Sequence, residues 1–366
     1  MERMFTKEKT NVCKGVGILF LLFHHMFRLE RFLTEHNMKF YLIPQKNSPT
    51  IATSARVCVW IFAFLSAYGL TYKYRHFFKE KKTGFLSKQW LSLMKPFWFI
   101  YLIGLLAFGL SGQSIAQKYE GNWLLLFIDA LGWGDFFHTP LLIGVFWYMC
   151  LAQMIVLLIP LTDRLLDVLS DYGYIALCAV VMVALQFLPA NIKSIYGGDY
   201  LIYLPVILLG SKLARDDTMN RLASIKLTTF KRVVICAALL IGTVGMQIAK
   251  NDLSSIDQWR IGGLLHSLSA VAICMLFGVF ITLPPLCKTL EFLGKYSGIM
   301  FIVHAMIYGW FPQIVYVSKF AILNYILLVG ESLAVSILIS YLMKWTRYDV
   351  WIGRAYDWIS QKRQHI

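Results

Sequence analysis

The chain has 366 residues, of which 58% are hydrophobic and 15% charged, and its formal net charge is +15. Soluble domains are nearer half apolar and a quarter charged, so this composition excludes a disordered chain, a disulfide-stapled secreted mini-protein and a typical cytosolic enzyme. The basic residues cluster in short segments between apolar stretches, which is the pattern of membrane topology signals and not of a nucleic-acid surface. The composition therefore predicts a membrane protein.

Ten stretches of the chain are long and apolar enough for a helix to cross a hydrocarbon core about 30 Å thick. In chain order they are residues 14–33, 54–72, 96–114, 140–160, 172–189, 198–214, 233–249, 262–283, 296–316 and 321–343. We therefore expect an all-α, polytopic membrane protein with about ten transmembrane helices, in which residues 1–343 form one membrane domain.

An even number of spans puts both termini on the same side of the membrane. The segments on that side carry 25 of the 35 lysines and arginines, so the positive-inside rule predicts that both termini are cytoplasmic. Little of the charge is left for a nucleic-acid partner, and none is expected. Residues 344–366 place Trp345 and Trp351 at helical spacing among Arg347 and Arg354, which predicts a cytoplasmic tail helix lying on the anionic membrane lipid.

Ionisable side chains inside a bilayer are costly, which makes each of them a candidate for function. Six stand out within the predicted spans, namely Lys14, His24, His25, His266, His304 and Glu331. Each also has a structural interpretation. A histidine can hydrogen-bond two helices together, Lys14 can extend to the inner surface, and Glu331 can be a neutral, hydrogen-bonded acid.

Lys14 and His25 are eleven residues apart, so they share one face of a helix and lie roughly 16 Å apart along it. That face offers a fixed cation near the inner surface and a titratable base deeper in the membrane. His24 points about 100° away and cannot line the same wall.

The ninth span begins with small residues, Gly294, Ser297 and Gly298, which allow a close helix approach. His304 lies about 10 Å deeper along that helix than Ser297. The hypothesis is that His304 meets His25 across a central cavity.

Three segments together resemble the acyltransferase 3 family, the integral-membrane acyltransferases that modify bacterial surface glycans. They are KGVGILFLLFHH at 14–25, VWIFAFLSAYGLTYKYR at 59–75 and LGKYSGIMFIVH at 293–304. The chain departs from the family pattern at Ala67, where a glycine is usual, and at Gln153, where some members have a glutamate. Lys88 and Lys95 stand where the family often has a pair of arginines.

The resemblance implies transfer of an acyl group, usually acetyl, from cytoplasmic acetyl-CoA or another acyl-CoA. The acceptor would be a hydroxyl of a surface glycan or a lipid-linked sugar, at the bacterial cytoplasmic membrane and without a metal. The phosphates of the donor need cations near the inner surface. The candidates are Lys14, Arg75, Lys88 and Lys95. These cations also fit a plain positive-inside signal.

A sugar hydroxyl is a poor nucleophile that needs a positioned base, and histidine suits neutral pH. We therefore expect His25 to be the catalytic base and His304 to be a second catalytic residue. Whether His25 activates the acceptor directly or first takes the acyl group stays open at this point.

Two other functions compete with acyl transfer. A transporter or flippase for a surface-polymer precursor would share the spans and the polar interior, but the sequence has no inverted repeat and no matching pair of spans broken by glycine or proline. A membrane scaffold with no catalytic activity would not explain why Lys14, His25 and His304 are placed inside the membrane, where ionisable groups cost free energy.

Overall fold

The computed structural model describes residues 5–28, 35, 38–40, 45–80, 84–189, 191–192, 195–253 and 255–362. These residues form helices and no β-strand, with one isolated parallel bridge between Lys39 and Phe320. Residues 29–33 of the first predicted span and 363–366 of the predicted tail lie outside the described residues.

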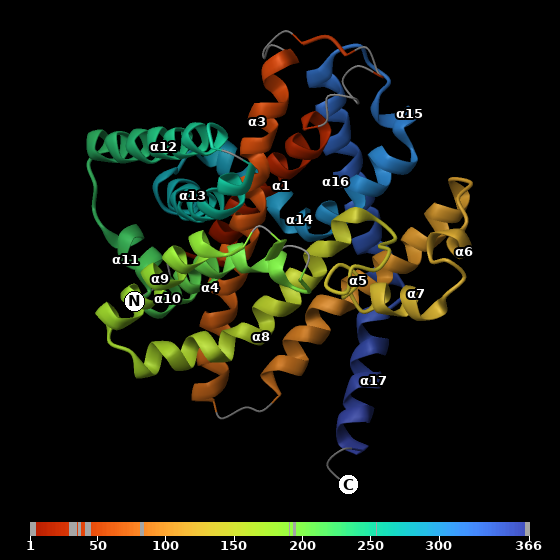
Figure 1. The fold of residues 1–366 in the computed structure, drawn as a ribbon, viewed down its shortest axis with the longest axis horizontal. Coiled ribbons are helices and arrows are strands. Elements are labelled where there is room, and N and C mark those ends of the chain that lie inside the picture. Colours follow the sequence, from red (N-terminus) through yellow and green to blue (C-terminus); the bar gives the residue numbers. More distant parts are fainter. Residues whose placement is uncertain are drawn as a thin grey trace.

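Eight helical segments in the described part of the chain are long and apolar enough to cross a membrane, which confirms an all-α polytopic membrane protein (Figure 1). Their main helices are α1 (Lys7–Phe27), α4 (Cys58–Lys79), α5 (Phe85–Leu110), α8 (Trp147–Val168), α12 (Thr229–Asn251), α13 (Ser255–Met275), α14 (Pro284–Trp310) and α16 (Ala321–Trp345). The shorter helices are α3 (Ser48–Ser54), α6 (Ile115–Lys118), α7 (Trp123–Ala130), α9 (Asp171–Ala184), α10 (Leu204–Arg215), α11 (Thr218–Ser224), α15 (Pro312–Val315) and α17 (Tyr348–Lys362).

The fifth and sixth predicted spans, 172–189 and 198–214, are helical over Asp171–Phe187 and 198–215, but each combines an α-helix with a 3-10 stretch. α9 has 14 residues and is continued by a single 3-10 turn over Leu185–Phe187, so the segment rises about 27 Å in all. α10 has 12 residues, and the six residues before it form a 3-10 helix. Pro205 fits the first turn of α10, because a proline there lacks only an N–H that has no intrahelical partner.

The predicted tail is helical as α17, which projects beyond α5 at the opposite end of the view from α3 and α15 (Figure 1). The end of α4 and the start of α5 point toward the same end as α17 (Figure 1). Two of the basic segments that the sequence assigns to one side of the membrane therefore lie together at one end of the molecule.

The centre of the fold is the pair α1 and α14, which pack more extensively on one another than any other two helices of the described chain. Two glycines allow the backbones to touch. A Cβ on Gly15 would lie 2.0 Å from the carbonyl oxygen of Leu290, and a Cβ on Gly294 would lie 1.8 Å from that of Asn11. The predicted close approach at Gly294 is therefore correct, whereas Gly298 faces open space.

Ala67, which stands where the family that the sequence resembles usually has a glycine, faces a glycine on the neighbouring helix. A Cβ built on Gly210 of α10 would lie 3.0 Å from the Ala67 methyl. The space that a glycine would leave on α4 is thus filled by Ala67, and the small residue stands on α10 instead. The substitution tightens one helix contact without preventing it.

Candidate active site

His25 of α1 and His304 of α14 lie against one another with their ring centroids 5.0 Å apart. Tyr308, one turn beyond His304, completes the cluster. Its hydroxyl lies 3.5 Å from His25 Nδ1, and its ring is nearly parallel to that of His25 at 6.2 Å. The expected meeting of the two histidines is therefore present, because the glycine contacts below them hold α1 and α14 together.

His304 is fully buried, and its tautomer follows from its neighbour. The Nδ1 atom lies 3.1 Å from the Met300 carbonyl oxygen, which can only accept, so Nδ1 carries the proton. Nε2 is then the acceptor of the ring. It is buried and has no hydrogen-bond partner among the described residues. A buried imidazole fixed in this way supplies a lone pair and no charge.

His25 opens onto a cavity of about 320 Å³, which we call the histidine cavity. It is lined by His25, Arg28, Ile143, Gly144, Val145, Trp147, Ala305, Tyr308, Gly309 and Trp310. Because His25 is partly exposed and His304 is buried behind it, His25 is the ring of the pair that can reach a substrate.

A second, mostly apolar cavity of about 240 Å³ lies between α4, α5, α8 and α14. We call it the apolar cavity; its lining includes Phe62, Pro96, Gly298 and Phe301, with the one cation Lys295. Val145 lines this cavity and also the histidine cavity. The two cavities therefore meet at one side chain, and the open face of Gly298 belongs to the apolar cavity and not to a helix contact.

The other two histidines of the spans belong to the packing. His24 Nδ1 lies 2.6 Å from the carbonyl oxygen of Ala52, so it joins α1 to α3 and points away from the histidine cavity, as its angle on the helix predicted. His266 is buried against Trp60, with ring centroids 4.4 Å apart. Glu331 Oε2 is buried without a hydrogen-bond partner among the described residues.

The family model for an acyltransferase domain matches residues 9–345, from the first turn of α1 to the last residue of α16. The chain belongs to the acyltransferase 3 family. Comparisons with curated proteins and with solved structures gave no match. Together with the membrane-spanning helices, membership supports a multi-pass membrane acyltransferase that transfers acyl groups to hydroxyls.

The four predicted donor-binding cations of this acyltransferase have separate surroundings. Lys14 is half-buried on α1, and Arg75 pairs with Asp163 of α8 at 3.4 Å. Lys88 lies 5.3 Å from the centre of the Phe77 ring, and Lys95 Nζ lies 3.3 Å from the carbonyl oxygen of Asp349 in α17. The ion pair gives the Arg75 guanidinium an anionic partner within the protein, which weakens the case for it as a phosphate ligand.

Gln153, which replaces a glutamate found in some acyltransferases of the family, is fully buried and bonds in two directions. Its amide nitrogen donates to the carbonyl oxygen of Leu131 at 3.0 Å, and its amide oxygen accepts from Trp90 Nε1 at 2.7 Å. An ionised glutamate could make only the second bond. The amide therefore joins the loop after α7 to α5 and α8.

Sequence reasoning missed Tyr308, Arg28 and Trp147 in the wall of the histidine cavity. Helical spacing contains a signal for the first two, since Tyr308 is four residues from His304 and Arg28 three from His25 on the same helix face. Trp147 comes from α8, and no local pattern links it to α1 or α14.

Proposed function

We propose that this acyltransferase moves an acetyl group from cytoplasmic acetyl-CoA to a hydroxyl of a surface glycan or lipid-linked sugar, at the bacterial cytoplasmic membrane. The observation that carries the proposal is His25, a partly exposed imidazole backed by His304 and opening onto the histidine cavity. A base held at a cavity wall by packed helices is what activation of a weak hydroxyl nucleophile requires.

In this proposal His25 takes the proton of the acceptor hydroxyl. With Nδ1–H donated to the Tyr308 oxygen, Nε2 is the free base. The hydroxyl oxygen attacks the thioester carbonyl, the carbon–sulfur bond breaks, and the departing thiolate takes the proton from His25 as free CoA. Arg28 lines the same cavity and provides positive charge for the carbonyl oxygen as it becomes negative.

The apolar cavity suits the thioester arm of the donor. Pro96 has no N–H, so the carbonyl of Ser92, one turn earlier in α5, lacks its usual intrahelical donor, and both residues line the cavity. That carbonyl is a ready acceptor for an amide N–H of the arm. Lys295 stands at the cavity wall on the side that the sequence assigns to the cytoplasm, where Lys14, Lys88 and Lys95 would meet the phosphates.

The test is the ester content of surface glycans from cells that carry wild-type protein, His25→Ala, His76→Ala or no protein, at equal membrane amounts. His76 is an exposed histidine on α4, so it controls for the chemical change alone. We expect O-acetyl esters with wild type and His76→Ala and none in the other two. Equal ester content in all four would overturn the proposal.

A second measurement separates the two possible orders of transfer. Purified protein is mixed with acetyl-CoA and labelled CoA in the absence of any acceptor. If His25 first takes the acyl group, the label exchanges into acetyl-CoA, whereas direct transfer gives no exchange. Binding of labelled acetyl-CoA in the same preparation distinguishes both from a transporter of a polymer precursor.

A further inference from the structure

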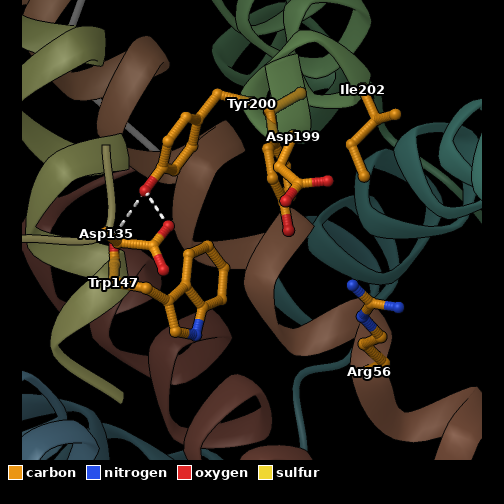
Figure 2. Close-up of a pocket in the computed structure, with 7 residues that line it drawn as sticks. Arg56, Asp135, Trp147, Asp199, Tyr200 and Ile202 are labelled. Carbon is orange, nitrogen blue, oxygen red and sulfur yellow. Dashed lines mark hydrogen bonds between the residues drawn. The ribbon is translucent and has the colours of Figure 1, made fainter. Parts of the chain in front are cut away.

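A third cavity, also about 320 Å³, shares Trp147 with the histidine cavity. We call it the aspartate cavity (Figure 2). It is lined by Arg56, Asp135, Trp147, Asp199, Tyr200, Ile202 and Tyr203. Trp147 lines both cavities, so the aspartate cavity and the histidine cavity share this residue as part of their walls.

The walls of the aspartate cavity combine carboxylates, a guanidinium and aromatic rings. The Tyr200 hydroxyl donates to Asp135 Oδ2 at 2.5 Å and approaches the Trp147 carbonyl oxygen at 3.3 Å, which fixes the carboxylate beside the indole (Figure 2). The rings of Trp147 and Tyr203 are nearly parallel, with centroids 6.1 Å apart. Asp199 and Arg56 are exposed, and Figure 2 shows both side chains across the cavity from Asp135.

This combination matches the chemistry of a neutral sugar. Carboxylates accept from hydroxyl groups, a guanidinium donates to hydroxyl and ring oxygens, and an aromatic face packs on the C–H face of a pyranose. The two aspartates outnumber the one arginine, so the lining disfavours the phosphates of acyl-CoA. The same argument disfavours a strongly anionic sugar.

The aspartate cavity also lies where the acceptor would arrive. Arg56, Asp135 and Asp199 come from three parts of the chain that the basic-residue distribution assigns to the outer ends of the spans. Lys295 in the apolar cavity comes from a segment assigned to the inner side. The three cavities thus follow one another through Val145 and Trp147, with the histidine pair at the middle one.

We propose that the aspartate cavity is the acceptor subsite and binds an uncharged, hydroxyl-rich saccharide, so that one hydroxyl reaches His25 past Trp147. The proposal rests on the proposed acyl transfer, because only then does a saccharide need to reach His25. Asp135 and Asp199 accept hydrogen bonds from sugar hydroxyls, Arg56 donates to sugar oxygens, and Trp147 supplies the stacking face.

The experiment measures steady-state transfer from acetyl-CoA to oligosaccharide released from the surface glycan of the expressing cells. The variants are Asp199→Asn and Asp135→Asn in purified full-length protein. Asp199 is exposed, so its amide isostere is expected to fold. Asp252→Asn is the control, since Asp252 is an exposed acid at the end of α12, outside the three cavities. Losing one hydrogen bond to a charged group is expected to raise the KM for the oligosaccharide about tenfold, with the KM for acetyl-CoA unchanged.

The outcomes separate this proposal from the one it rests on. Wild-type protein that transfers acetyl, with both cavity variants matching Asp252→Asn in KM for the oligosaccharide, overturns the acceptor subsite and leaves acyl transfer intact. An equal rise in the KM for the oligosaccharide and in the KM for acetyl-CoA also overturns it, because such a rise indicates a general defect of the protein and not a lost acceptor contact. Wild-type protein that neither binds acetyl-CoA nor transfers acetyl would contradict the proposed function itself.

Discussion

The backbone of α14 at Gly294 touches that of α1 at Asn11, since a Cβ on Gly294 would lie 1.8 Å from the Asn11 carbonyl oxygen. Within the same helices, His304 and His25 meet at a centroid distance of 5.0 Å. Helix association in lipid depends on close packing because there is no hydrophobic drive between helices. The glycine contact therefore sets the spacing on which the histidine pair depends.

Gly294→Ala is expected to destabilise the protein by about 1–3 kcal/mol and to lower activity, because the methyl group forces α1 and α14 apart. Gly298→Ala, one turn away, is the matched control for stability, as nothing lies within 4 Å of its Cβ position. Thermal unfolding of both variants in detergent is the measurement. If Gly294→Ala and Gly298→Ala have equal melting temperatures, α1 and α14 accommodate the added methyl group without loss of stability, which contradicts the prediction.

His304→Ala is expected to lower kcat while leaving the KM for acetyl-CoA in place, because His304 packs on His25 and does not itself reach the histidine cavity. Removal of any buried ring also leaves a void that costs stability. His266→Ala controls for that, since His266 is equally buried but packs on Trp60. If kcat per folded molecule falls equally in both variants, His304 has only a packing role.

Lys14→Ala is expected to raise the KM for acetyl-CoA about tenfold with kcat little changed, because a lost charge-assisted phosphate contact weakens ground-state and transition-state binding alike. Lys14→Arg should keep most of the affinity, and Lys319→Ala removes a cation on the predicted outer side as a control. The effect should shrink at high salt. If wild type and Lys14→Ala have the same KM for acetyl-CoA, Lys14 does not bind the donor and serves only the positive-inside topology of the chain.

The sequence predicted those structural features that are determined within a single helix. Apolar length located the eight long spans, and helical spacing placed His24 away from His25. Residues 172–189 and 198–214 are also helical in the structure, over Asp171–Phe187 and 198–215, but hydropathy does not register the 3-10 stretch that each of them includes. The meeting of His25 and His304 could be stated as a hypothesis, since small residues precede His304 on its helix.

Sites formed by residues from several helices could not be predicted from the sequence. Asp135 lies in loop-like sequence where an acid is ordinary, and Asp199 lies at the very start of a predicted span. Only the tertiary packing brings both of them to one cavity with Trp147. The same holds for Arg75, whose charge alone suggested a phosphate ligand. Its ion pair with Asp163 depends on the approach of α4 and α8, which no spacing within either helix predicts.

Asp129 in α7 is a fully buried acid outside the long spans. Burial raises the pKa of Asp129 to about 6, even though a hydrogen bond from the Tyr119 hydroxyl at 2.6 Å and one from the Leu142 amide at 2.7 Å favour the ionised form. Leu142 directly precedes the stretch 143–145 that lines the histidine cavity. The carboxyl group thus holds one wall of that cavity.

The raised pKa of Asp129 predicts a loss of stability as pH rises from about 4 to about 6. In this window the unfolded chain has already released the proton, whereas the folded protein still binds it, so the folded state is favoured by acid. A rise in the pKa from about 3.9 in the unfolded chain to about 6 in the folded protein changes the free energy of unfolding by at most roughly 3 kcal/mol. Melting temperatures in detergent across this pH range measure the effect.

Asp129→Asn is the variant that isolates this group, because the amide oxygen can still accept from Tyr119 and from the Leu142 amide but nothing titrates. Its melting temperature should change less between about pH 4 and pH 6 than that of wild type. The difference between the two proteins, and not the slope of either alone, reports Asp129, since other acids titrate in the same window. Parallel curves for the two proteins would mean that the carboxyl group ionises in the folded protein as readily as in the unfolded chain.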